Sequence, residues 1–239
     1  MPDSMSFSDP ADLQNFIDDI AQDYSMVGAV SFGAIPLGHA VVFSTVRVPK
    51  ATCYKTDNGF GLAGSALSMI AGAAGVSVTQ SVQTHYDPAG MAAFIVSVAR
   101  QEITGEVRSE SKSGQIDLRP GTKEYETMLR EGESRRKVAI EKKWEKVPEA
   151  DGQIRAKLKH LSALTETKAY LRAVRKLLSL DRSFSEAELA KPFGVLRLSF
   201  TGRCPQNPEI EMMFARGLMG AALGGTAALY GRAAMPQLG

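Results

Sequence analysis

The sequence predicts an α+β protein in which an antiparallel β-meander precedes a long basic helix, with an additional helix and strands toward the N-terminus. Two observations carry this prediction. Residues 76–119 contain β-branched, partly alternating runs joined by short turns, which favours antiparallel strands. After residue 120 the apolar residues recur at helical spacing instead. The 44% hydrophobic and 23% charged content fits a globular chain with a real core.

The N-terminal part begins with an amphipathic helix over residues 10–25. Its apolar residues recur at i, i+3, i+4 and i+7, and they are Leu13, Phe16, Ile17 and Ile20. The outer face is acidic, because the first 50 residues contain six Asp against one Arg and one Lys. A turn at residues 35–38 then leads into a predicted strand at 40–48.

The middle of the chain contains the meander. A turn at residues 56–59 precedes a small-residue helix at 65–74, which Gly75 can close as a C-cap. Three strands are then predicted at 76–86, 92–107 and 115–119. The connecting turns are expected at 87–90 and 109–114.

Two helices are predicted next, at residues 123–146 and 154–180, with residues 148–152 between them. The second has an apolar stripe of Leu161, Leu164, Leu171, Val174, Leu177 and Leu178. A short helical element at 184–189 and a last strand at 193–200 follow. We therefore expect an acidic N-terminal region at 1–50, an α+β core at 51–204, and a tail at 205–239 that is rich in Ala, Gly and Met.

The cysteine content and the hydropathy of the chain indicate the cellular compartment in which the protein is expected. The two cysteines lie far apart in the chain and form no metal-ligand spacing, so we expect a reducing environment. The first 23 residues contain no Lys or Arg, unlike the start of a signal peptide. No apolar run reaches the roughly 18 residues that a membrane-spanning helix needs, so we expect no membrane partner.

Positive charge is concentrated in one part of the chain. Residues 123–182 contain 16 Lys and Arg against 10 Asp and Glu, although the whole chain has a formal charge of only +2. Within the second predicted helix, Lys168, Arg172 and Arg175 recur at i, i+4 and i+7 and therefore share one side. A solvated helix face is the simpler explanation for such a run, but one dominant sign suits a phosphate backbone.

Two short motifs suggest enzymes instead. Residues 59–64 match GxGxxG before a helix, but a polar turn precedes them and the strands that follow are predicted antiparallel, whereas a dinucleotide fold needs a parallel crossover. Glu166 and Lys168 spell the ExK half of a metal-dependent nuclease signature, although such a pair is usually presented from a strand. A nuclease and a nucleotide-binding enzyme therefore stand as alternatives to a binding protein.

The order of the elements resembles that of phage single-strand annealing proteins of the RecT, Red-beta and Rad52 superfamily. The resemblance covers about residues 59–200 and depends on the helix at 67–75, the meander, and the helix that reads ETKAYLRAVRKLL at 166–178. It implies a meander packed on a long basic helix that lines a groove for single-stranded DNA. The acidic N-terminal helix departs from the family pattern.

The resemblance also implies a function: annealing of complementary strands without ATP or another cofactor, for recombination and repair. It assigns DNA contacts to Lys168, Arg172, Arg175 and Lys176. On charge alone, the expected surface also includes Arg155, Lys157, Lys159, Arg100, Arg108, Lys112 and Arg119. The implied setting is the cytoplasm of a bacterial host with a phage-encoded protein, and the implied partners are further copies in a ring or helical filament, a phage exonuclease and a host single-strand-binding protein.

Overall fold

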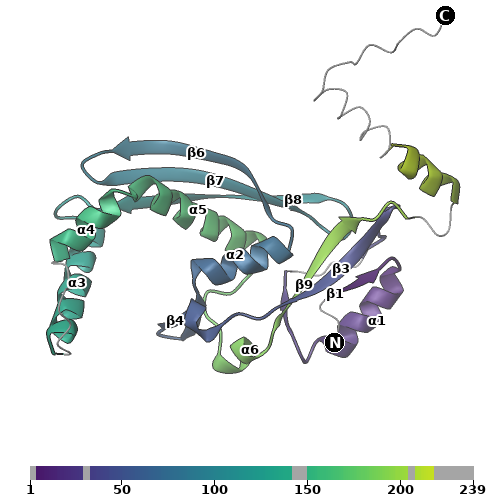
Figure 1. The fold of residues 1–239 in the computed structure, drawn as a ribbon, viewed down its shortest axis with the longest axis horizontal. Coiled ribbons are helices and arrows are strands. Elements are labelled where there is room, and N and C mark those ends of the chain that lie inside the picture. Colours follow the sequence, from purple (N-terminus) through teal and green to yellow (C-terminus); the bar gives the residue numbers. More distant parts are fainter. Residues whose placement is uncertain (1–3, 29–32, 142–149, 204–207, 218–239) are drawn as a thin grey trace, which may run out of the picture.

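The computed structural model describes residues 4–28, 33–141, 150–203 and 208–217. These residues form the predicted α+β fold, in which a three-stranded antiparallel meander packs on a helix. Figure 1 shows the meander above this helix, with the sheet that contains the N-terminal strands at the opposite end. The three sheets have the strand orders β1-β3-β9-β2, β4-β5 and β6-β7-β8.

The four-stranded sheet pairs three strands of the N-terminal region with the last strand of the described chain. It contains β1 (Ser4–Phe7), β2 (Ser25–Val27), β3 (His39–Val46) and β9 (Phe193–Phe200), with β2 parallel to β9 and the other pairs antiparallel. Helix α1 (Pro10–Ile20) packs on this sheet through Leu13, Ile17 and Ile20. The helix starts where the Asp9 carboxylate accepts from Ala11 N–H, and it ends five residues earlier than predicted because the chain turns into β2.

A short hairpin leads to the second helix. The 3-10 turn η1 (Lys50–Thr52), β4 (Cys53–Thr56) and β5 (Gly59–Leu62) precede α2 (Gly64–Ala73). The predicted turn lies between β4 and β5, as expected. Gly75 follows α2 with φ of +68°, the left-handed conformation that the predicted C-cap requires.

The meander contains three strands of 11 residues each, β6 (Ser77–Asp87), β7 (Met91–Gln101) and β8 (Val107–Asp117). The bounds predicted for the second and third strands were wrong. The turn lies at 102–106, inside the strand expected at 92–107, and residues 109–114 are part of β8. The misplacement has a physical cause: one face of β8 is open to solvent, so the strand shows polar alternation without an apolar face.

The helices after the meander also differ in detail from the prediction. Helix α3 (Lys123–Glu141) is followed by α4 (Ala150–Leu158) and α5 (Leu161–Leu177), so the single helix expected at 154–180 is two helices. At the break, His160 N–H donates to Lys157 O, an i to i−3 bond that ends α4. Helix α6 (Glu186–Ala190) then leads into β9.

One buried cluster connects the two larger sheets. Meander residues such as Val96 and α5 residues such as Val174 share it with Ile70 of α2 and with Phe193 of β9. Helix α2 contacts α5 on one side and β3 and β9 on the other. The four-stranded sheet is therefore attached to the meander through α2 and α5.

The described part of the predicted tail is a helix. Residues 208–217 are helical, and the Phe214 ring packs edge-on against Phe200 with centroids 5.3 Å apart. The part of the glycine-rich sequence beyond residue 217 lies outside the described residues.

Candidate nucleic-acid interface

Helix α5 lies in direct backbone contact with β8 at Gly114. A Cβ atom at this glycine would lie 2.7 Å from Ala169 N and 2.8 Å from Thr165 O. The missing side chain therefore allows α5 to approach the sheet closely. Side chains on the flank of α5 can then reach the outer edge of β8.

Two of the predicted cations bond to that edge. Lys168 Nζ donates to Gln115 O at 2.7 Å, and Arg172 Nη1 donates to Ser113 O at 3.2 Å. Lys168 Nζ also lies 2.7 Å from Glu124 Oε1 of α3. Lys168 and Arg172 therefore lie on one side of the helix, as expected. The carboxylate of Glu124 neutralises Lys168. Arg172 is exposed, and among the described residues its hydrogen-bond partner is a backbone oxygen.

The other two cations of α5 differ in exposure. Arg175 is half-buried, and its Nη2 donates to Leu62 O at 3.4 Å. Its buried Nε has no hydrogen-bond partner within the described parts of the chain. Lys176 is exposed, and no acidic side chain among the described residues pairs with it. Arg172 and Lys176 are therefore the α5 cations best placed to meet a ligand.

Helix α4 and the segment after it add three exposed cations, Arg155, Lys157 and Lys159. In the described chain none of the three has an ion pair with a carboxylate. Positive charge that acidic neighbours leave uncompensated thus extends from α4 to the C-terminal end of α5.

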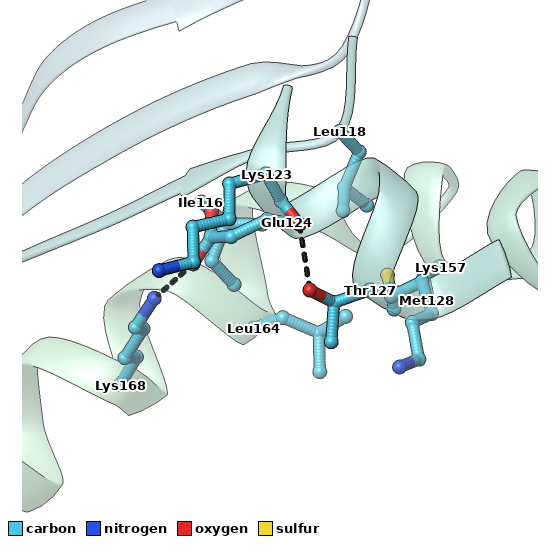
Figure 2. A pocket seen from close by; sticks show the side chains of 9 residues that line it. All are labelled: Ile116, Leu118, Lys123, Glu124, Thr127, Met128, Lys157, Leu164 and Lys168. Carbon is cyan, nitrogen blue, oxygen red and sulfur yellow. Dashed lines mark hydrogen bonds and ion pairs between the residues drawn. The ribbon is translucent and has the colours of Figure 1, made fainter. Parts of the chain in front are cut away.

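A cavity of about 430 Å³ opens between α3, α4, α5 and the end of β8. Figure 2 shows Lys168 reaching toward Glu124 at one side of it, with Leu164 below and Lys157 at the other side. Ile116, Leu118 and Met128 form much of its apolar wall. Three lysines line this apolar cavity: Lys123, Lys157 and Lys168.

Three predicted cations of the meander are paired with acids. Arg108 lies 3.9 Å from Glu102, and Lys112 lies 3.8 Å from Glu110. Arg119 lies 2.6 Å from Asp117 and 3.6 Å from Asp87, and its hydrogen bond lowers the pKa of the Asp117 carboxyl below the ordinary value. Lys112 and Arg119 therefore contribute little net positive charge to the surface. Arg108 shares the Glu102 carboxylate with Arg100, so one positive charge remains there.

Arg100 does not extend the exposed surface, so that expectation was wrong. Its side chain is only 6% exposed, and its guanidinium bonds to the Glu102 carboxylate at 2.5 and 3.1 Å. The reason is the true position of the turn at 102–106, which places Glu102 beside Arg100 at the end of β7.

The two residues of the nuclease motif point to opposite edges of the meander. Glu166 accepts from Ser81 Oγ of β6 at 2.5 Å, whereas Lys168 contacts β8. A metal-dependent nuclease needs these groups to converge on one ion. Across the described residues, no group of three potential ligands for a metal ion occurs.

The glycine motif at 59–64 lies in an antiparallel hairpin. Gly59 and Gly61 belong to β5, whose partner is β4, and the strand after α2 pairs only with β7 among the described strands. A dinucleotide site of the expected kind needs a parallel strand after the helix. The described fold has no such strand at this position.

Sequence reasoning missed the cavity and Lys123. The sequence assigned Leu164 to the apolar stripe of α5, but in the structure its side chain is 40% exposed and lines the cavity instead of the core. Lys123 comes from the first turn of α3, 45 positions before Lys168 in the sequence. Only the packing of three helices brings these residues together.

Comparison with models of protein families, with curated proteins and with solved structures gave no match. Among the helices of the described residues, none is long and apolar enough to cross a membrane.

Proposed function

We propose that this protein binds single-stranded DNA along α4 and α5 and anneals complementary strands without ATP. The observation that carries the proposal is the combination of uncompensated cations with an apolar cavity on the same helices. The proposal treats the protein as a binding protein and assigns it no covalent chemistry.

The cations suit the phosphates of a strand. Arg155, Lys157, Lys159, Arg172 and Lys176 are exposed and have no carboxylate partner within the described chain. Each phosphate that a cation neutralises releases counterions, which favours binding at low salt. Lys168, which is paired with Glu124, lines the cavity together with Lys157.

The cavity suits an unpaired base. Its volume is within the roughly 300–1,000 Å³ typical of small-molecule pockets, and Leu164, Met128 and Ile116 give it an apolar wall. A base in a duplex is stacked and paired, so it cannot enter without an energetic cost. This supports a preference for single strands.

The resemblance to the RecT, Red-beta and Rad52 superfamily supports the annealing step. Under this proposal the strand is held by its phosphates while most bases stay available for pairing. The same resemblance supports a ring or filament of copies, a phage exonuclease or host single-strand-binding protein as partner, and the cytoplasm of a bacterial host as the location.

The test is fluorescence anisotropy of a labelled single strand across a salt series, with unlabelled duplex as competitor. We expect tight binding that weakens linearly in log salt and resists the duplex. The double variant Arg172→Glu, Lys176→Glu should reduce affinity at least tenfold. It should also flatten the salt slope by about 0.7 for each lost phosphate contact. Arg175 is left unchanged because it is half-buried.

The matched control is Arg47→Glu, Lys55→Glu, which changes the formal charge equally at exposed positions outside α4 and α5. This control should bind almost as well as the natural protein. If both double variants lost affinity equally, the loss would come from net charge alone, and the assignment of the binding surface to α4 and α5 would be wrong. Annealing is then measured with complementary dye-labelled strands in the absence of nucleotide.

A further inference from the structure

The two outer strands of the meander differ in how their edges are protected. On β8, Arg172 and Lys168 donate to Ser113 O and Gln115 O, and Glu124 Oε2 accepts from Asp117 N–H at 2.7 Å. The same strand also carries charged side chains, namely Arg108, Glu110 and Lys112. Side-chain bonds and charge both discourage the addition of another strand.

Strand β6 has neither protection. It is 11 residues long, ten of them are exposed, and among the described strands it pairs only with β7. Its sequence contains no Lys, Arg, Glu or Pro, and its one acidic residue, Asp87, is at the end. The ladder with β7 shifts register near Thr79 and Thr84 but is regular between them. A long, uncharged edge normally marks a place where another strand pairs.

The exposed apolar residues of β6 are arranged so that the strand complements itself. Val78, Val82 and Tyr86 are 55%, 41% and 52% exposed. In an antiparallel pair centred on Val82, Val82 faces its own copy and Val78 faces Tyr86. Val78 and Tyr86 share one face of the sheet, since their partners Val98 and Ala92 are both buried on the α5 side.

We propose that two copies of this chain associate by antiparallel pairing of their β6 strands about a two-fold axis at Val82. This register opposes no like charges and buries apolar side chains on both faces. The occupant of the edge is a second copy and not β8 of another chain, because β8 is closed by Arg172, Lys168 and Glu124. Such an interface is isologous and closes as a pair.

The inference goes beyond the proposed function, because a two-fold pair is neither the ring nor the filament, which need a head-to-tail contact. It does not require DNA binding. All measurements are therefore made on the full chain without DNA. If annealing fails and the pair persists, the proposed function is wrong and the interface stands. If the chain binds single-stranded DNA but forms no β6-paired dimer, the interface is wrong and the proposed function stands.

The first experiment is disulfide trapping of Val82→Cys in a background of Cys53→Ser and Cys204→Ser. Directly opposed residues of an antiparallel pair have Cα atoms about 4.5–5.5 Å apart, within the range that a disulfide spans. Mild oxidation should therefore give a covalent dimer in high yield. The matched control is Ile95→Cys, which is 42% exposed on β7 directly beside Val82. In the proposed pair the two copies of position 95 would be three strand spacings apart, about 14 Å, so these cysteines should not form a disulfide.

The second experiment is the solution mass of Val82→Lys and Ile95→Lys, measured by light scattering. Lysines opposed at the axis should halve the mass, whereas a lysine on β7 should leave it unchanged. Circular dichroism confirms that both variants fold. Equal linking of the two cysteine variants, or an unchanged mass for Val82→Lys, would overturn the proposal.

Discussion

At the scale of single residues, Gly114 determines where α5 lies. Its φ is not in the left-handed region, so the glycine is required by space alone. The atoms that a Cβ would meet belong to the backbone of α5, which cannot move aside as a side chain can. The reach of Lys168 and Arg172 to the β8 edge therefore depends on this position.

We expect Gly114→Ala to lower the free energy of unfolding by about 1–3 kcal/mol, the usual effect of overpacking. Urea denaturation measures this change. Gly72→Ala in α2 is the matched control, because its Cβ would meet nothing within 4 Å. That control should instead raise stability by roughly 0.5–1 kcal/mol, since alanine replaces glycine within a helix. Equal effects of the two substitutions would contradict the close contact at Gly114.

At the scale of elements, α6 is a short helix that depends on its N-cap. Ser185 Oγ accepts from Glu188 N–H at 3.2 Å, and Glu188 Oε2 accepts from Ser185 N–H and from the Ser185 hydroxyl, each at 2.7 Å. The Ser185 backbone N–H, followed by its hydroxyl, holds the pKa of the Glu188 carboxyl below its ordinary value of 4.5. Because the folded pKa is lowered, the resulting stability is present above the ordinary pKa and is lost as the pH falls through the folded pKa.

Ser185→Ala should lower the free energy of unfolding by about 1 kcal/mol near pH 7. Part of this loss comes from the hydroxyl bond to the charged carboxylate, so the difference from the natural protein should be smaller at pH 3. Urea titrations at the two pH values measure it. Glu188→Gln is the control, because it removes the titrating group while the Ser185 hydroxyl can still accept from the backbone. A difference that is as large at pH 3 as at pH 7 would contradict the assignment.

The sequence predicted elements well where one face of an element is buried. Leu13, Ile17 and Ile20 mark α1, and β9 lies at the predicted residues because Phe193, Val195 and Leu196 are buried. Strand β8 was misplaced because most of its residues are exposed or half-buried, and pairing with β7, which is not local, defines it. The break between α4 and α5 has no Gly or Pro to signal it.

The candidate site could be predicted only as a list of basic residues. The sequence does not reveal which of them acids neutralise, because partners such as Lys168 and Glu124 lie 44 positions apart. Arg100 illustrates the same limit, since its burial depends on a turn that local patterns placed elsewhere. Charge counting therefore predicts that a basic surface exists, while packing decides which cations form it.

At the scale of the whole molecule, the shared buried cluster predicts a single unfolding transition. Val96 and Val98 of β7 and Phe193 and Val195 of β9 belong to the same cluster as α2 and α5. Hydrogen exchange should therefore give the β7 and β9 amides the same free energy of opening. Exchange of the β7 amides through a much less costly opening would mean that the meander unfolds alone.

The position of α2 between α5 and the four-stranded sheet also has a thermodynamic consequence for ligands. A ligand that binds only the folded state raises the free energy of every unfolding event that disrupts its site. The buried cluster that contains α5 residues also contains β9 residues. A DNA strand bound on α5 would therefore protect the four-stranded sheet against heat and proteases as strongly as it protects the meander. Stabilisation of the four-stranded sheet would then report that a ligand is bound on α5, at the opposite end of the protein.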